Sequence, residues 1–320
     1  MTRDQAGTEA TLAHPPAPVS PEFGSLAAGA QRGSMTDSTL TDKAAAENFP
    51  VALRLLPRRH RGHLMAVYNY ARTVDDIGDE APADQRLGLL DALDDDLLRL
   101  QQVVGDQAQP ASVASQPLHP AVRGLAAVVT ECGVPIQPFR DLIAANRQDQ
   151  VVTRYETFDE LLGYCTLSAN PVGQIVLQVF GSSTPERVQL SDAICSGLQV
   201  VEHLQDVGED YRAGRIYLPV EDLRAHGCSE DDLGVQTAPS RLRRLIAAEA
   251  DRAAALISAG APLIGQLRGA ARLAVAGYVA GGRAALAAIA AADYDVLTAT
   301  PRPAKSRTVR ELVKSLARGR

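Results

Sequence analysis

The most informative stretch of this sequence reads Tyr68-Asn69-Tyr70-Ala71-Arg72-Thr73-Val74-Asp75-Asp76-Ile77-Gly78-Asp79. In and just before it, apolar residues recur at the spacing of one helix face, namely Leu64, Val67, Ala71 and Val74. A neighbouring face holds Tyr68, Arg72, Asp75 and Asp79, with Asp76 beside them. The stretch therefore predicts a helix that packs one face on a core and carries a cation and several carboxylates beside that face.

A second stretch, far along the chain, repeats this arrangement and reads Glu202-His203-Leu204-Gln205-Asp206-Val207-Gly208-Glu209-Asp210. Its apolar face consists of Ile194, Leu198, Val201 and Leu204. Glu202, Asp206 and Asp210 follow one another at helical spacing, and Glu209 lies one turn from Asp206. This pattern predicts a second helix with an acidic face.

Carboxylates stacked in this way repel one another by about 0.2–0.5 kcal/mol per pair on an isolated helix, so a cation is needed to neutralise them. Mg²⁺ binds oxygen ligands and typically combines one or two carboxylates with waters and substrate phosphates. Two facing acidic helices would hold Mg²⁺, or Mn²⁺ in its place, together with a diphosphate. The alternative is that both acidic runs are solvated surface. The apolar face behind each run, and a guanidinium near each (Arg72 and Arg215), favour the metal site.

Several motifs resemble those of the squalene/phytoene synthase family, in the same order. They are Arg72-x-x-Asp75-Asp76-x-x-Asp79, Tyr164-Cys165-x-x-Ser168-Ala169-Asn170-Pro171-Val172-Gly173, Asp206-x-x-Glu209-Asp210 and Gly214-Arg215-Ile216-Tyr217-Leu218-Pro219. The Ser-Ala-Asn-Pro segment, together with Glu47-Asn48-Phe49-Pro50, is similar to the hopanoid-pathway branch of that family, the hydroxysqualene synthases. The resemblance covers about residues 44–300.

This resemblance implies an all-α isoprenoid-synthase fold, a helical bundle around a central apolar cavity. The metal ligands that it implies are Asp75, Asp76, Asp79, Glu202, Asp206, Glu209 and Asp210. The residues that it implies for contact with the reacting substrate are Tyr68, Arg72, Asp76, Asn170, Arg215 and Tyr217. The implied reaction is ionisation of presqualene diphosphate, rearrangement of the cation and capture by water, which gives hydroxysqualene. No NADPH is expected, and no G-x-G-x-x-G segment follows a strand to bind one.

Four residues leave alternatives open. Glu202 replaces the usual Asn of the family's second motif, adds negative charge and leaves the number of bound ions undecided. Glu47 stands where condensing branches carry a cation, which fits an enzyme that handles one diphosphate at a time, or it is simply a carboxylate in a first helical turn. Asn170 either holds a water or caps the helix that begins at Pro171. Tyr217 either faces the reacting carbon or anchors its loop on the core.

Composition frames these motifs. With 320 residues, 46% of them hydrophobic, the chain can bury a large core. A net charge of −6 argues against nucleic-acid binding. Four widely spaced cysteines predict reduced thiols in a cytoplasmic protein and argue against a disulfide framework or a zinc site.

Three regions are expected along the chain: a disordered extension over 1–40, an all-helical domain over 41–298 and a basic tail over 299–320. Helices are predicted at 42–56, 61–80, 83–104, 120–132, 136–151, 157–167, 170–181, 187–210, 240–259 and 264–292. No signal peptide and no membrane span are expected. The tail either makes peripheral contact with an anionic membrane or is a solvated end.

Two other functions fit the same motifs. One is head-to-head condensation of two prenyl diphosphates, as in squalene or phytoene synthases. The other is a catalytically silent assembly-factor scaffold of this fold, although such scaffolds tend to lose the acidic ligands. A head-to-tail prenyltransferase would need a second Asp-Asp-x-x-Asp motif, which this sequence lacks. The expected partners are a prenyl diphosphate substrate and other enzymes of its pathway.

Overall fold

The computed structural model describes residues 57–105 and 119–318, and the regular structure in these ranges is helical, without strands. The first helices are α3 (Arg58–Glu80), α4 (Arg86–Gly105), α5 (Pro120–Gly124), α6 (Ala126–Cys132), α7 (Gln137–Asp149), α8 (Phe158–Ser168) and α9 (Asn170–Val179). They are followed by α10 (Pro185–Arg212), α11 (Val220–Ala225), η2 (Glu230–Leu233), α12 (Ser240–Gly260), α13 (Leu263–Gln266), α14 (Gly269–Ala291) and α15 (Lys305–Arg318). The predicted all-α class is confirmed. The predicted extension 1–40, the helix 42–56 and Glu47 lie outside the described residues.

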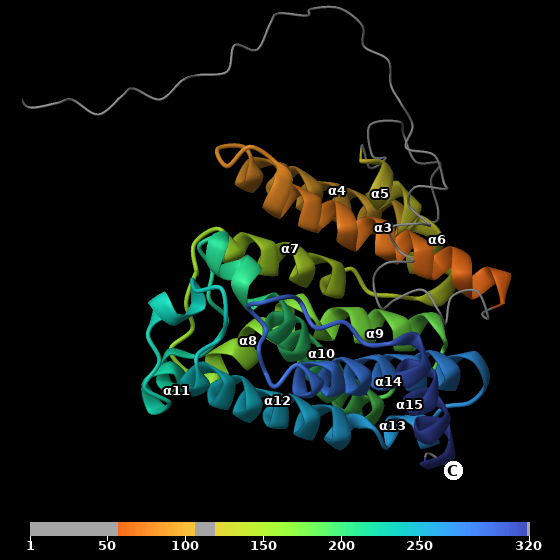
Figure 1. Cartoon of the computed structure of the whole chain (residues 1–320). Coiled ribbons are helices and arrows are strands. Elements are labelled where there is room, and N and C mark those ends of the chain that lie inside the picture. The colour runs from red at the N-terminus through yellow and green to blue at the C-terminus, as the bar shows by residue number, and fades with distance from the viewer. Residues whose placement is uncertain (1–56, 106–118, 319–320) are drawn as a thin grey trace, which may run out of the picture.

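The helices form layers, with α3 to α6 at the top of Figure 1, α7 to α10 in the middle and α12 to α15 at the bottom. Two clusters of buried apolar side chains hold these layers together. Helices α7 and α9 contribute to both clusters, because Ile143 and Ile175 face the upper one while Ala145 and Leu177 face the lower one. Helices α7 and α9, which also contact each other, therefore fix α3 relative to α10.

Both helices that carry the acidic motifs form for the reasons that the sequence suggests. In α3, Leu64, Val67 and Val74 are buried, and the buried Tyr70 hydroxyl donates to the Phe139 carbonyl of α7 over 2.9 Å. Helix α10 starts at an N-cap, where the Thr184 hydroxyl accepts from a backbone N–H of the first turn, and it continues for 28 residues. Figure 1 shows the carboxyl-terminal ends of α3 and α10 at the same end of the bundle.

Two predicted helices are each broken in the structure. The segment 120–132 divides into α5 and α6 at Leu125, which is completely buried and follows Gly124, a poor helix former. The segment 264–292 divides into α13 and α14, because Leu267 and Arg268 adopt extended backbone conformations and Leu267 turns into the core. The short helices α11 and η2 were not predicted, since each is too brief to show helical periodicity.

Helix α14 is the one helix among the described residues whose length and apolar composition would suffice to cross a membrane. Within the fold it packs against α10, α12, α13 and α15, and 56% of its apolar stretch is buried inside the protein. A helix in the core of a globular bundle meets the same criteria of length and composition.

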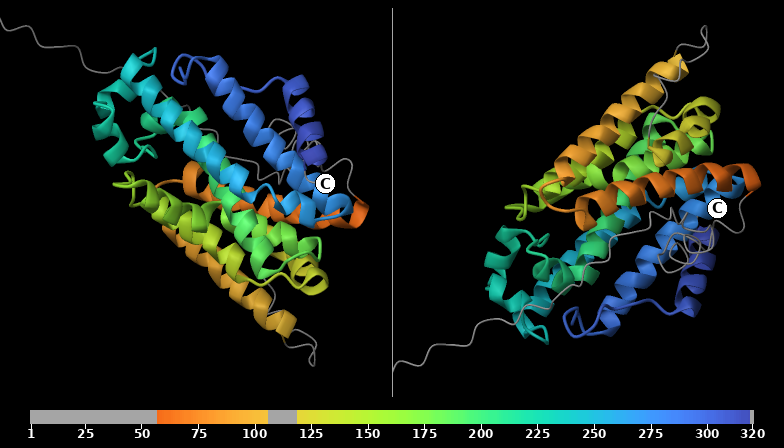
Figure 2. Two further views of the ribbon diagram at one scale, coloured as in Figure 1. Left: turned by 90° about the horizontal axis from the view of Figure 1, so that it is seen from below. Right: turned by 90° about the horizontal axis from the view of Figure 1, so that it is seen from above.

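Residues 305–318 of the expected tail form α15, which packs on α14. Leu312 and Leu316 contact the lower core, and Ser315 is only 2% exposed. Figure 2 shows α15 beside α14 at the outer edge of the bundle.

Candidate active site

The two acidic motifs lie on the two expected helices. We call Asp75, Asp76 and Asp79 of α3 the first acidic wall, and Glu202, Asp206, Glu209 and Asp210 of α10 the second acidic wall.

Each carboxylate of the first acidic wall has a polar partner. Asn146 of α7 donates its side-chain N–H to Asp75 over 3.2 Å. Arg72 Nε lies 2.8 Å from Asp76 Oδ1, an ion-pair contact whose geometry does not make it a hydrogen bond, and Arg72 also contacts Glu80 at 3.3 Å. A charged face on α3 is thus held in place by its own arginine and by an amide from the middle layer.

Gly78 explains how Asn146 reaches the first acidic wall. A Cβ atom at position 78 would lie 2.0 Å from Asn146 Oδ1. The absence of a side chain therefore lets the Asn146 amide pass against α3 and reach Asp75.

Arg215 connects the two walls. Its Nη1 atom donates to Asp79 Oδ1 over 2.8 Å, although Arg215 follows α10 in the sequence. The chain turns after α10 at Gly214, whose φ of 85° favours glycine. Arg154 donates to the Gly214 carbonyl over 2.8 Å, and the Arg215 N–H donates to the Asp210 carbonyl over 2.9 Å. The turn therefore aims a guanidinium from the second wall at the first.

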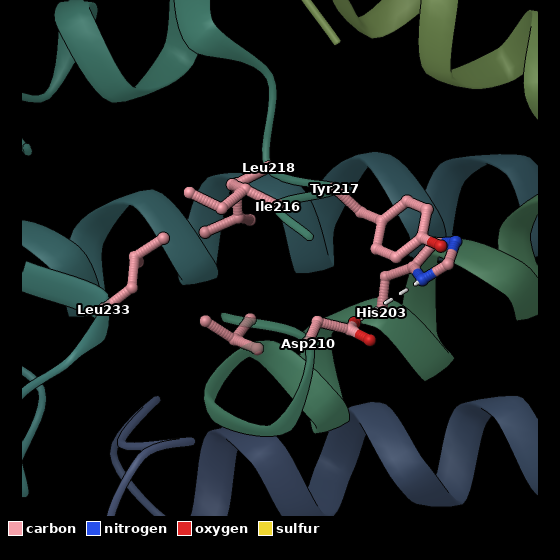
Figure 3. A pocket seen from close by; sticks show the side chains of 7 residues that line it. His203, Asp210, Ile216, Tyr217, Leu218 and Leu233 are labelled. Atoms are coloured by element: carbon pink, nitrogen blue, oxygen red, sulfur yellow. Dashed lines mark ion pairs between the residues drawn. The ribbon is translucent and has the colours of Figure 1, made fainter. Parts of the chain in front are cut away.

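Two stacked rings, those of His203 and Tyr217, lie beside the second acidic wall. The rings of His203 and Tyr217 stack with their centroids 3.7 Å apart, and Figure 3 shows the Asp210 carboxylate beside them. His203 Nδ1 lies 3.9 Å from Asp210 Oδ2. Burial and the Arg215 charge lower the pKa of His203 to about 3, so this imidazole is neutral and its contact with Asp210 is polar and not an ion pair. The cavity at this point measures about 10 Å³, which is the space of one water molecule.

Asp149, at the end of α7, lies between the walls. It accepts hydrogen bonds from the Tyr164 hydroxyl over 2.7 Å and from the Tyr217 hydroxyl over 3.1 Å. Burial raises its pKa, while the charges of Arg215 and Asp79 act on it in opposite directions. Asp149 thus fixes two phenols and interacts electrostatically with residues from both walls.

Three carboxylates of the two walls, Asp75, Asp206 and Asp210, are costly to ionise without a cation, because the pKa of each is raised. Asp75 is exposed on one side, and burial of the rest of its side chain raises its pKa to about 6, with Asp79 and Asp76 adding to the effect and the hydrogen bond from Asn146 opposing it. Burial likewise raises the pKa of Asp210 to about 7, with Asp206, Glu209 and Asp149 adding to the effect and Arg215 opposing it. Burial also raises the pKa of Asp206, and the charge of Arg302 acts against that rise.

The structure brings together some predicted residues and not others. It joins Asp79, Arg215 and Asp210, and it places Tyr217 against them through Asp149. Glu202 is exposed and lies about two helical turns before Asp210 on α10. Tyr68 is half-buried, about two turns before Asp75 on α3.

Asn170 is the first residue of α9, and the backbone N-cap position belongs to Ala169. The interpretation of Asn170 as a helix cap is therefore wrong. Its side chain is 6% exposed and instead accepts a hydrogen bond from the Ser196 hydroxyl of α10 over 3.0 Å. The nearby Ser168 hydroxyl is buried and has no hydrogen-bond partner among the described residues.

Four further residues belong to this site although sequence patterns did not predict them, namely Asn146, Asp149, His203 and Arg302. His203 could have been found, because it lies within the acidic stretch of α10. The others come from α7 and from the segment before α15, and no periodic pattern links them to either wall.

The residues present fit Mg²⁺ bound together with a diphosphate. Their donors are carboxylate oxygens, the ligands that this ion prefers. Within residues 57–105 and 119–318, no three His, Cys, Asp or Glu side chains converge to hold a metal by themselves. Mg²⁺ does not need such a set, since waters and phosphate oxygens supply most of its ligands. Buried Arg215 Nε has no hydrogen-bond partner among the described residues, which suits a phosphate oxygen as acceptor.

Comparison with known proteins places this geometry in a family. The model of the family described as squalene/phytoene synthase matches residues 42–310. A hydroxysqualene synthase from Rhodopseudomonas palustris is 40% identical over 225 residues, which are 69% of this chain and 72% of that protein. A phytoene synthase from Mycobacterium tuberculosis is 35% identical over 229 residues, 70% of this chain and 71% of that protein.

A solved structure supports the same assignment. The squalene synthase HpnC from Alicyclobacillus acidocaldarius aligns with a TM-score of 0.70 and 38% identity, over 80% of this chain and 92% of that one. The predicted isoprenoid-synthase fold is thereby confirmed. The chain belongs to the squalene/phytoene synthase family and is an enzyme of isoprenoid biosynthesis.

Proposed function

We propose that this enzyme converts presqualene diphosphate into hydroxysqualene. One observation carries the proposal: Arg215 donates to the first acidic wall from the loop that follows the second, and its buried Nε atom lacks a partner among the described residues. A diphosphate between the walls would satisfy that group. The hydroxysqualene synthase from R. palustris, at 40% identity, favours this branch over the phytoene synthases.

The proposed reaction balances without a redox partner. The C–O bond of the cyclopropylcarbinyl diphosphate breaks, and its electron pair leaves with the diphosphate. The cation rearranges, a water oxygen forms a new C–O bond, and a proton is released. Because no electrons are gained overall, the proposal requires no NADPH.

The first task of the site is to stabilise the negative charge that develops on the leaving diphosphate. Mg²⁺, held by carboxylates such as Asp75 and Asp210, would supply Lewis-acid stabilisation of the diphosphate. Arg215 donates charge-assisted hydrogen bonds to the diphosphate oxygens, and Arg72 adds positive charge from α3. Guanidinium groups suit this task because they bind phosphate bidentately.

The aromatic side chains accompany the carbocation. Tyr68 and Tyr217 offer ring faces, which stabilise a desolvated cation by up to about 2 kcal/mol. Asp149 holds the Tyr217 and Tyr164 hydroxyls, so these rings are oriented before the substrate ionises.

Capture by water depends on polar groups at the junction of α8 and α9. Asn170 is buried and already accepts from Ser196, which leaves its amide N–H groups as donors. Together with the unpartnered Ser168 hydroxyl, this amide holds the attacking water. A purely apolar surface at this point would instead favour loss of a proton.

The proposed setting is the cytoplasmic side of the cell membrane. Pathway enzymes would supply presqualene diphosphate, and the hydrocarbon-like product would leave into lipid. Peripheral contact with the membrane would shorten both transfers.

The purified protein should be incubated with presqualene diphosphate and Mg²⁺ in ¹⁸O-labelled water, without reductant, and its products analysed by mass spectrometry. Hydroxysqualene that carries ¹⁸O is the expected product. In a parallel reaction with farnesyl diphosphate alone, accumulation of presqualene diphosphate would assign the condensation reaction instead. Phytoene from geranylgeranyl diphosphate would assign the phytoene synthase branch.

A further inference from the structure

Helix α15 uses one face to attach to the bundle. Leu312 and Leu316 of that face pack against the lower core, and Ser315 is buried. Two arginines of α14 fix the helix, because Arg272 donates to the Leu316 carbonyl over 2.8 Å and Arg283 donates to the Ser315 hydroxyl over 3.3 Å. The position of α15 is therefore determined by the fold.

The solvent-exposed side of α15 combines apolar and basic side chains. Val309 and Val313, one turn apart, are 58% and 62% exposed. The exposed basic residues on and just before this helix are Arg302, Lys305, Arg307, Arg310 and Lys314. Glu311 is the only acidic residue of α15, and it pairs with Lys314 at 2.7 Å. We call Lys305, Val309, Arg310, Val313 and Lys314 the outer face of α15.

This charge is local, because the chain as a whole carries a net charge of −6. A cluster of four or more Lys and Arg on an amphipathic helix is typical of segments that bind anionic lipid headgroups. The two exposed valines on the same face would enter the boundary between headgroups and acyl chains. Figure 2 shows α15 at the edge of the bundle.

We infer that the outer face of α15 binds an anionic phospholipid bilayer. The basic side chains contact lipid phosphates while the two valines insert shallowly, and the helix remains docked on α14. The membrane contact itself is independent of the proposed reaction. Its purpose rests on that reaction, since transfer of a lipid-soluble product needs a bilayer nearby.

Co-sedimentation of the full chain with vesicles tests this inference. One set contains phosphatidylcholine alone and a second contains phosphatidylcholine with phosphatidylglycerol. We expect binding to the second set, weakened by salt because the attraction is electrostatic. Each cation near the surface contributes about fivefold, so K305Q/R310Q/K314Q should lower the partition coefficient about a hundredfold. The variant V309S/V313S should weaken binding about three- to tenfold and retain the salt dependence.

A matched control removes the same charge elsewhere. R58Q/R224Q/R244Q neutralises three exposed arginines outside α15 and should bind vesicles like the wild type. Thermal unfolding of every variant checks that α15 remains docked. The inference is overturned if the wild type ignores phosphatidylglycerol, or if the control triple loses as much binding as the α15 triple. It is also overturned if the outer face proves to join two copies, seen as a dimer that V309S/V313S dissociates. None of these outcomes depends on turnover, so product analysis judges the proposed function separately.

Discussion

The two acidic walls face one site but are built differently. On α3, Asp76 and Asp79 have side chains that are 45% and 52% exposed, and long arginine side chains hold them. On α10, the Asp210 side chain is 17% exposed and lies against the stacked rings of His203 and Tyr217. Asp76 and Asp79 of the first wall are thus held by partners that solvent can replace, whereas Asp210 of the second wall is largely buried and preorganised by its neighbours.

This difference assigns a separate task to each wall. Exposed carboxylates can follow a substrate and its cations into place, because solvent and flexible partners replace lost contacts. Burial raises the pKa of Asp210 to about 7, so a bound cation would stabilise its ionised form and Asp210 favours the bound state of the site. Arg215 follows the second wall along the chain and its side chain contacts Asp79 of the first wall, so it is the residue that couples the two walls.

The largest effect is expected from removing one carboxylate of either wall. Asp75→Asn and Asp210→Asn should each lower kcat by about a hundred- to a thousandfold, since each removes a charge that stabilises the leaving diphosphate through its cation. Diphosphate release from presqualene diphosphate at fixed Mg²⁺ measures this. Asp251→Asn, the same change at an exposed position of α12, should leave kcat unchanged. If only one of the two variants lost activity, the two walls would not act together.

Substitutions of two arginines compare Arg215, which couples the two walls, with Arg72, whose ion pairs lie on α3. Arg215→Lys should lower kcat about a hundredfold, because an ammonium cannot contact Asp79 and a phosphate with the same planar geometry. Arg72→Lys should cost only about tenfold, since its ion pairs with Asp76 and Glu80 lie within α3 and a lysine can keep one of them. Steady-state kinetics of the two variants decides. Equal losses would contradict the special position of Arg215.

A smaller effect is expected at Asp149, which positions side chains of the second wall. Asp149→Asn can accept from only one of the two phenols as before, so kcat should fall about tenfold while KM changes little. Asp192→Asn is the control, because Asp192 is also partly buried and accepts from Gln174 at 3.2 Å, near the start of α10 and several turns from Asp210. If both variants behaved alike, the role of Asp149 would be structural only.

The smallest effect concerns a buried carboxylate away from both walls. Glu249 of α12 is 1% exposed, and burial raises its pKa from 4.5 to about 7, with Arg252 opposing the rise. A raised pKa in the folded state means that folding takes up a proton between these pH values, so stability falls as pH rises through this window.

Glu249→Gln should therefore stabilise the protein by roughly 1 to 3 kcal/mol above that window and much less below it, without affecting kcat. Thermal unfolding at several pH values tests this. Asp210→Asn should show a similar pH-dependent gain in stability but lose activity, and that separates burial from function. A Glu249→Gln variant whose Tm shift did not depend on pH would refute the assignment.

Much of the fold could be predicted because it is periodic. The regular spacing of apolar residues predicted the ends of α3 and α10 to within a few residues, and the same spacing predicted their acidic faces. Predictions failed where tertiary packing overrides periodicity, as at Leu125 and Leu267, whose buried side chains interrupt two long helices.

The candidate site shows the same limit. Residues on the two walls were predictable from their spacing, but Asn146 and Asp149 reach the site only because α7 packs beneath α3. The sequence alone does not show why position 78 is glycine. The reason appears only in the structure, where a side chain at this position would collide with Asn146. Single-sequence patterns describe one helix at a time, and the partners between helices come from the fold.

The central claim is that the two walls act on one diphosphate, and a double-mutant cycle on Asp75→Asn and Asp210→Asn tests it most directly. Diphosphate release would be measured for the wild type, both single variants and the double variant at the same Mg²⁺ concentration. If the walls share one bound group, the double variant should be scarcely slower than either single one, because the first loss already removes the common interaction. Losses that multiply in full would contradict the account, since they would mean that the two walls contribute independently.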